Sequence, residues 1–141
     1  MYAMPYKRPR PHTYTLHVKR GTSGLGLFAQ QDIPRSAFVT EYWGELLTDK
    51  QADERSGKYL FQMDNGKTID GATRKNVARY INHSCKPNCE VNFYGNRIFI
   101  ESLRKISAGE ELTYDYDTEY FDAYIKPCGC RCAACKKSKK T

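Results

Sequence analysis

The stretch that decides the fold runs Arg79-Tyr80-Ile81-Asn82-His83-Ser84-Cys85-Lys86-Pro87-Asn88-Cys89, called the polar run below. An amide, an imidazole, a hydroxyl and a thiol follow one another, and the residue before Pro87 is biased toward an extended conformation. Because buried polar groups need hydrogen-bonding partners, so dense a polar run is not expected in the core. It carries too much specific chemistry for an ordinary surface turn, so we expect it to be the centre of an active site.

The chain has 141 residues, a length that predicts one domain with a real core. No apolar run approaches the roughly 20 residues that span a bilayer, so no membrane association is expected. Residues 1–11 contain no apolar segment of the kind that a secretory signal needs. We therefore expect the six cysteines to be in a reducing, intracellular compartment, where metal ligation or free thiols are favoured over disulfides.

The net charge of +7 is strongly segregated along the chain. Residues 1–20 hold five Lys and Arg without an acid, and residues 126–141 hold six, whereas residues 21–125 carry a net charge of −4. Basic ends are typical of a polyanion partner such as nucleic acid, but two solvated tails explain them equally well. The acidic run at 110–122, with six acids and no base, indicates a basic ligand instead.

The pattern of short β-branched and aromatic runs between turn residues predicts a β-rich protein with little helix. Residues 1–12 are expected to form an extended arm, and residues 20–29 a Gly-rich turn that leads into an apolar run. A short helix should begin near Thr48 and end at Gly57, and residues 76–81 should form one helical turn. Strands are expected at 14–19, 38–43, 59–63, 67–70, 89–93, 97–103 and 111–116, with hairpin turns at 64–66 and 94–96.

Four cysteines lie within eight residues near the end of the chain: Cys128, Cys130, Cys132 and Cys135. A structural zinc ion takes four ligands in a tetrahedron, which is hard to build from so short a segment. Three ligands from this tail and one from elsewhere is the more relaxed arrangement, with Cys85 as the natural donor and Cys89 as its competitor. A disulfide cluster and a set of unpaired thiols are the alternatives, and the missing secretory signal favours zinc over both.

Tyr114 and Tyr116 point to the same face of the predicted strand at 111–116. Two phenol rings on one face can line a narrow slot that attracts an ammonium or a sulfonium, and a phenol can orient an amine. Tyr42 is a candidate third wall. Tyrosines that simply face the core are an equally good interpretation of these residues alone.

Taken together and in this order, five segments resemble the SET-domain protein lysine methyltransferases. The likeness extends over roughly residues 15–136, and the motifs Asn-His-Ser-Cys-x-Pro-Asn and Glu-Leu-Thr-Tyr-Asp-Tyr are its most specific parts. The segments are Gly24-Leu25-Gly26, Tyr42-Trp43-Gly44, residues 79–88, residues 111–116 and Cys128-x-Cys130-x4-Cys135.

The resemblance implies a SET fold of small β-sheets around a pseudoknot, in which the segment after 82–85 and the 111–116 strand thread past each other. It divides the chain into a basic arm (1–13), a SET domain (14–122) and a post-SET zinc-binding tail (123–141). Zinc would be held by Cys85, Cys128, Cys130 and Cys135, which leaves Cys89 and Cys132 as spare thiols.

The resemblance also implies S-adenosylmethionine as cofactor, with a substrate lysine entering from the opposite face. Tyr116 matches the catalytic tyrosine of the family, Tyr114 matches the position that tunes the number of methyl groups, and Tyr42 lines the channel. The implied cofactor contacts are Ser23, Gly24, Leu25, Gly26, Tyr42, Arg79, Asn82, His83 and Gly129.

The implied activity is S-adenosylmethionine-dependent N-methylation of lysine in histone tails or similar basic peptides, with mono- and dimethylation favoured by the hydroxyl at position 114. The basic ends would contact DNA or nucleosome phosphates. The expected location is nuclear chromatin for a eukaryotic or viral protein, or the host cell for a secreted bacterial effector. A catalytically silent SET-like module that binds basic peptides or nucleic acid, and a plain zinc-binding nucleic-acid adaptor, are the alternatives.

Overall fold

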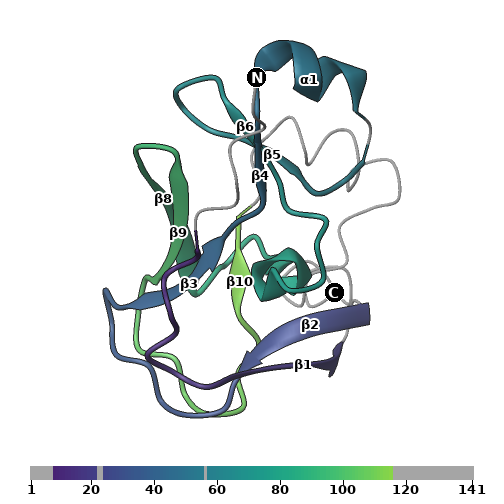
Figure 1. The fold of residues 1–141 in the computed structure, drawn as a ribbon. Helices are drawn as coiled ribbons and strands as arrows, with labels where there is room; N and C mark the ends of the chain where they lie inside the picture. Colours follow the sequence, from purple (N-terminus) through teal and green to yellow (C-terminus); the bar gives the residue numbers. More distant parts are fainter. Residues whose placement is uncertain (1–7, 22–23, 56, 116–141) are drawn as a thin grey trace.

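The structure is a computed structural model that describes residues 8–21, 24–55 and 57–115. These residues form four small β-sheets, one short α-helix and one 3-10 turn, so the β-rich class is confirmed (Figure 1). The longest helix described here has six residues, far fewer than a membrane span needs. The elements are β1 (Leu16–Gly21), β2 (Gly24–Ala29), β3 (Phe38–Tyr42), β4 (Glu45–Leu47), α1 (Asp49–Glu54), β5 (Leu60–Gln62), β6 (Thr68–Asp70), η1 (Val77–Tyr80), β7 (Asn82–His83), β8 (Cys89–Tyr94), β9 (Arg97–Ser102) and β10 (Thr113–Tyr114).

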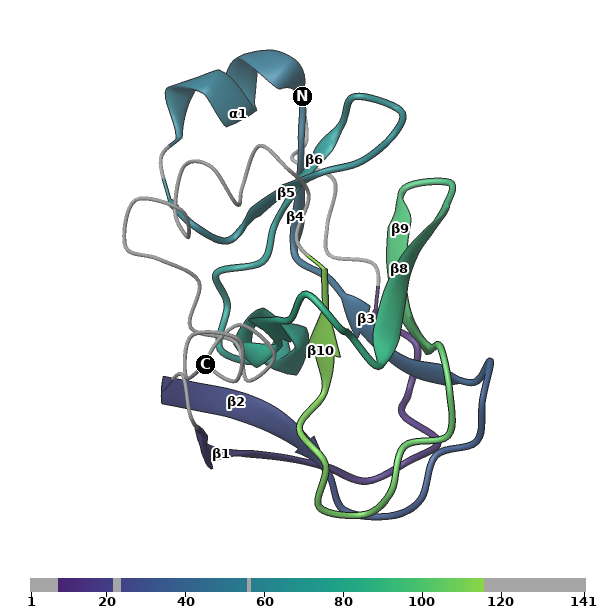
Figure 2. The ribbon, with the colours of Figure 1, turned by 180° about the vertical axis from the view of Figure 1, so that it is seen from behind.

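Three of the sheets are antiparallel: β1-β2, β3-β9-β8 and β4-β6-β5. The fourth is the parallel pair of β7 with β10, whose register places Thr113 opposite Asn82 and Tyr114 opposite His83. Figures 1 and 2 show α1 with the β4-β6-β5 sheet at one end of the molecule and β1-β2 at the other. In both views β10 lies in the middle, beside η1 and the β8-β9 hairpin.

Local sequence signals predicted several elements correctly. The turns at 64–66 and 94–96 join antiparallel strand pairs, and Gly66 and Gly95 adopt φ values of +85° and +62° that favour glycine. Thr48 caps α1 in a capping box, in which its hydroxyl accepts from the Gln51 backbone N–H while the Gln51 side chain accepts from the Thr48 N–H. The helix ends at Glu54, three residues before the predicted Gly57.

Two predictions about the strands near the expected site were wrong in detail. The Gly24-Leu25-Gly26 segment lies within strand β2 and pairs with β1, so it is not part of a turn. The strand expected at 111–116 contains only Thr113–Tyr114 as β10 among its described residues, because Glu111 bridges to Phe28 instead. The segment before β10 therefore pairs with β2, whereas β10 itself pairs with β7.

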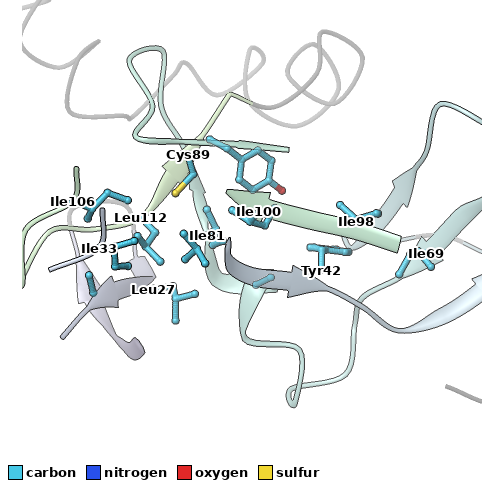
Figure 3. Packing of buried hydrophobic residues seen from close by; sticks show 14 of the residues in the cluster. Leu27, Ile33, Tyr42, Ile69, Ile81, Cys89, Ile98, Ile100, Ile106 and Leu112 are labelled. Atoms are coloured by element: carbon cyan, nitrogen blue, oxygen red, sulfur yellow. The ribbon is translucent and has the colours of Figure 1, made fainter. Parts of the chain in front are cut away.

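A single apolar cluster joins the sheets (Figure 3). Ile98 and Ile100 of β9 are fully buried, as are Leu27 of β2 and Leu112 just before β10. In Figure 3, Ile81, Cys89 and Ile100 lie between Tyr42 at one side and Leu27 at the other, so the core is continuous from the β1-β2 end toward β4-β6-β5. This continuity fixes the small sheets relative to one another.

The described part of the N-terminal arm packs on β3 and β9. The backbone N–H of Arg10 donates to Glu41, and the guanidinium of Arg10 lies 4.3 Å from the centre of the Phe38 ring. His12 hydrogen-bonds Thr40 through Nε2 at 2.7 Å. Glu41 is buried and also accepts two hydrogen bonds from the guanidinium of Arg97. Residues 8–12 thus have no regular secondary structure but are held in place.

The polar run is far more buried than its composition predicted, and that expectation was wrong. His83 and Ser84 are each 7% exposed, and Asn88 is 4% exposed. The partners that make this possible come from the segment around β10: Asn88 donates through Nδ2 to the Glu111 carbonyl at 2.8 Å and accepts through Oδ1 from the Thr113 N–H at 2.9 Å. Because these hydrogen bonds satisfy the Asn88 side chain, its burial carries no large penalty.

We predict that Asn88→Ala lowers the free energy of unfolding by roughly 2–4 kcal/mol, because the Glu111 carbonyl and the Thr113 N–H both lose their buried partner. Urea denaturation followed by circular dichroism measures this loss. Asn65→Ala, which removes only exposed hydrogen bonds, is the control and should cost less than about 1 kcal/mol. Equal losses for the two variants would contradict the role of Asn88.

Candidate active site

Three segments that are distant in sequence meet at β10. On one side β10 pairs in parallel with β7, and the Ser84 N–H donates to the Tyr114 carbonyl. On the other side the residues just before β10 run along β2, where the Leu112 N–H donates to the Leu27 carbonyl at 2.8 Å. This arrangement brings the Gly-x-Gly strand and the Asn-His pair to the same place, and the binding of a cofactor there stays a prediction.

The Asn82 side chain joins these segments directly. Its Nδ2 donates to the Leu25 carbonyl at 2.9 Å and to the Glu111 carboxylate at 2.8 Å. Leu25 itself is 52% exposed although it is a large apolar residue. An exposed leucine next to a fixed amide suits a ligand that has both an apolar and a polar part.

His83 is 7% exposed and lies between an acid and a thiol. Its Nδ1 is 3.4 Å from the Asp115 carboxylate, and its Nε2 is 3.3 Å from the Cys85 sulfur. Burial lowers the pKa of His83 below its ordinary value, although the Asp115 carboxylate acts in the opposite direction. The imidazole is therefore neutral at pH 7 and can serve as a hydrogen-bonding group without adding charge.

The two cysteines of the polar run differ in their environments. Cys85 is exposed, whereas Cys89 is buried at the start of β8. Burial raises the pKa of Cys89 to about 12, which keeps its thiol protonated. Zinc binds the thiolate form, so Cys85 has the environment of a ligand and Cys89 that of a core residue. The described residues contain no group of three or more potential metal ligands.

The rings of Tyr42 and Tyr114 each contact that of Phe61, with which they form an aromatic cluster. The Phe61 ring centre is 5.1 Å from that of Tyr42 and 6.3 Å from that of Tyr114. The Tyr42 hydroxyl donates to the Tyr59 carbonyl at 2.7 Å, which orients its ring. Any side chain at Gly71 would place Cβ 2.4 Å from that ring, so glycine is required there. Both predicted channel tyrosines thus belong to one aromatic surface.

Phe61 was not among the predicted site residues. It lies on the short strand β5, which pairs with β6 in a sheet separate from β10. The sequence marked residues 59–63 as a hairpin strand but carried no signal for which residue of that strand would face Tyr114. Glu111 was also missed, although it directly precedes the Leu-Thr-Tyr segment.

Arg79 is positioned by contacts of its own. Its Nη1 donates to the Ala72 carbonyl, and its guanidinium stacks on the ring of Tyr59 at 4.1 Å and lies 5.2 Å from that of Tyr80. The Nε atom is buried and has no hydrogen-bond partner within the described part of the chain. A role of Arg79 toward a cofactor stays a prediction.

Acids in the first half of the acidic run already form an ion pair or hydrogen bonds within the protein. Glu110 pairs with Arg104 and accepts from the Ser107 N–H, and Glu111 accepts from Asn82. Of the three acids that are described in this run, only Asp115 has a mostly exposed side chain, 64%. The attraction of a basic ligand to this run therefore depends on fewer charges than its composition indicated.

The remaining predicted site residues lie outside the described part of the chain. They are Ser23 of the predicted Gly-x-Gly region, the predicted catalytic Tyr116, Gly129 and the predicted zinc ligands Cys128, Cys130 and Cys135. The structure thus brings together Gly24, Leu25, Gly26, Asn82, His83 and Cys85 around β7 and β10, with Tyr42 and Tyr114 on the aromatic cluster.

Known proteins match this chain closely. It is 41% identical over 150 residues to histone-lysine N-methyltransferase trithorax of Drosophila virilis, a match that covers 96% of this chain and 4% of that protein. It is 40% identical over 127 residues to histone-lysine N-methyltransferase 2D of Homo sapiens, covering 81% of this chain and 2% of that protein. It is also 40% identical over 126 residues to histone-lysine N-methyltransferase set1 of Dictyostelium discoideum, a match that covers 80% of this chain and 8% of that protein.

The chain therefore spans less than a tenth of the length of each of these relatives. The profile of the SET domain family matches residues 24–117, which include β2, the polar run and β10. This match over most of the chain, together with the identities of 40% and 41%, shows that the chain belongs to the SET-domain family.

Proposed function

We propose that this protein is an S-adenosylmethionine-dependent protein lysine N-methyltransferase. The observation that supports this most strongly is the meeting of the Gly-x-Gly strand, the Asn82-His83 pair and Tyr114 around one parallel strand pair. The printed names of the relatives, histone-lysine N-methyltransferases, support the same reaction.

The residues present fit the cofactor. Leu25 offers an exposed apolar side chain, and the Asn82 amide is held beside it at a fixed position. Gly24, Gly26, Asn82 and His83 would hold the cofactor together with Ser23, Tyr42, Arg79 and Gly129, several of them through the backbone. When bound, S-adenosylmethionine supplies an electrophilic methyl group on a sulfonium.

The chain itself would align and dehydrate the substrate amine. Aromatic walls such as Tyr42 and Tyr114 attract the lysine side chain while they exclude water from it. A lysine must lose its proton before it attacks, and partial desolvation in such a slot lowers its pKa. We assign Tyr116 as the phenol nearest the reacting atoms, so that its hydroxyl orients the amine.

The donor set also fits a structural zinc ion. Cys85, Cys128, Cys130 and Cys135 would hold it as thiolates, and the exposed position of Cys85 is compatible with this role, whereas the buried Cys89 is not. Since Cys85 follows the Asn82-His83 pair by two residues, the metal would tie the tail to the cofactor site. Cys132 is left without an assigned role.

The substrate proposed is a histone tail or a similar basic peptide, with the product limited to mono- and dimethyl-lysine. The names of relatives from a fly, a human and an amoeba favour a nuclear, chromatin-associated protein over a secreted bacterial effector. DNA or nucleosome contact through the basic termini is part of the proposal. Arg10 in the described arm already stacks on Phe38, so other basic residues would make the phosphate contacts.

An array of lysine-containing histone peptides, incubated with the protein and S-adenosylmethionine and analysed by mass spectrometry, tests this function. We expect mass increases of one or two methyl groups on particular lysines. Tyr116→Phe should abolish transfer but retain cofactor binding, and a fully active variant would refute the catalytic assignment. Peptide binding without any transfer would favour the catalytically silent module instead.

We predict that Tyr114→Phe shifts the products toward a higher methylation state, because removal of the hydroxyl leaves more room around the amine. Mass spectra of a single peptide substrate measure the product distribution. Tyr94→Phe serves as the matched control, since Tyr94 is an exposed tyrosine on the β8-β9 hairpin and should leave the distribution unchanged. An unchanged distribution in Tyr114→Phe would count against the assignment.

We predict that chelation of zinc weakens the binding of S-adenosylmethionine by roughly 5- to 150-fold, the usual range for coupled sites. Calorimetric titration before and after chelation measures this change. In parallel, alkylation mapped by mass spectrometry should label Cys85 only after chelation and Cys89 only after unfolding. A Cys85 that reacts equally with and without zinc is the result that would remove it from the ligand set.

A further inference from the structure

Glu111 occupies a position that its sequence context does not explain. Its carboxylate accepts a hydrogen bond from Asn82 Nδ2 at 2.8 Å, across 29 residues of sequence. Within residues 8–21, 24–55 and 57–115, no salt bridge to this carboxylate is formed. A partly buried acid that bonds a neutral amide instead of a cation indicates a specific role for that hydrogen bond.

The contacts with Glu111 and Leu25 together use both donors of the Asn82 side-chain amide. One N–H of the amide donates to Glu111 and the other is available for the Leu25 carbonyl, 2.9 Å from Nδ2. The amide is therefore fixed in one orientation, in which Oδ1 is the group left to meet a ligand. A ligand atom that contacts this oxygen has to be a hydrogen-bond donor, for example an ammonium group.

Two glycines make the space that the carboxylate occupies. A Cβ added at Gly26 would lie 2.4 Å from Oε2 of Glu111 and 3.0 Å from its Cδ, and one added at Gly21 would lie 3.0 Å from Oε1. Gly26 and Gly21 lie on the paired strands β2 and β1. Their φ values are not in the left-handed region. Glycine is therefore favoured at these two positions by the space that the carboxylate takes, and not by the backbone conformation.

We propose that Glu111 is a positioning residue of the cofactor site, and that Gly26 is a glycine because the Glu111 carboxylate must pass it to hold Asn82. This rests on the proposed function, in which Asn82 contacts S-adenosylmethionine. It also gives the second glycine of the Gly-x-Gly segment a role that involves the protein itself, in addition to any close approach of a ligand.

The affinity for S-adenosylmethionine tests the positioning role. Glu111→Ala should weaken binding about tenfold or more, because the amide loses the acceptor that orients it. Glu111→Gln has a side chain of the same length with one acceptor oxygen, so its affinity should be within about threefold of that of the wild-type protein. The Michaelis constant for the cofactor should rise in Glu111→Ala, with a smaller change in kcat at saturating cofactor. Glu54→Ala, an exposed acid of α1, is the control.

A loss in Glu111→Gln equal to that in Glu111→Ala would overturn the positioning role and assign the effect to the negative charge. Cofactor affinity that is unchanged in Glu111→Ala, while the wild-type protein binds S-adenosylmethionine, would also overturn it.

A double-mutant cycle tests the link between Gly26 and Glu111. Gly26→Ala alone should displace the carboxylate from Asn82 and weaken cofactor binding. In the Glu111→Ala background the same change should add less than about a twofold loss, since no carboxylate remains to be displaced. The Phe28 ring, 3.2 Å from the added Cβ, is present in both backgrounds and so does not create coupling. Additive losses would overturn the link.

The Asn82 side-chain amide gives a readout that needs no cofactor. In nuclear magnetic resonance spectra of the free protein, its two N–H signals should be protected from solvent exchange in the wild type and lose that protection in both Glu111→Ala and Gly26→Ala. Unchanged signals would overturn the inference. A wild-type protein with protected signals that does not bind S-adenosylmethionine would instead refute the proposed function, so the two failures are distinguishable.

Discussion

The parallel pairing of β7 with β10 is the constraint on which the rest of the structure depends. It joins Asn82-His83 to Thr113-Tyr114, and no turn or short loop brings these segments together. The Asn88 side chain secures the pairing by bonding the backbone on both sides of Leu112. The Leu112 N–H also donates to the Leu27 carbonyl, so β2 lies beside the same segment. Without the β7-β10 pairing, the polar and aromatic side chains of the three segments would lie on separate small sheets.

The buried part of the polar run is stabilised by side-chain hydrogen bonds to segments that are distant in the sequence. Asn82 bonds β2 and the residue before β10, and Asn88 bonds the residues on either side of Leu112. Such a network costs little when all its members are satisfied, and it orients side chains more rigidly than apolar packing does. The apolar core below it supplies most of the stabilisation, whereas the polar network fixes the geometry of the site.

The elements that the sequence predicted correctly are those with local causes. The Asn65-Gly66 turn, the Thr48 capping box and the 3-10 turn before Asn82 depend on residues a few positions apart. The burial of the polar run was predicted wrongly because its partners lie some 25 residues later in the chain, where no periodicity links them. Phe61 was missed for the same reason. The site residues themselves came from the resemblance to a family. Composition and spacing alone explained the tyrosines equally well as core residues, and the Gly-x-Gly segment as part of a turn.

We propose that Leu25, Asn82 and His83 form one ligand surface around the β7-β10 pair. A titration of the ¹⁵N-labelled protein with S-adenosylmethionine, followed by nuclear magnetic resonance, is a direct test of this surface. We expect the largest changes in chemical shift at the amides of Leu25, Gly26, Asn82 and His83, while α1 and the turn at Gly95 remain unchanged. Changes confined to α1 or the β8-β9 hairpin, or no changes at saturating cofactor, would contradict it.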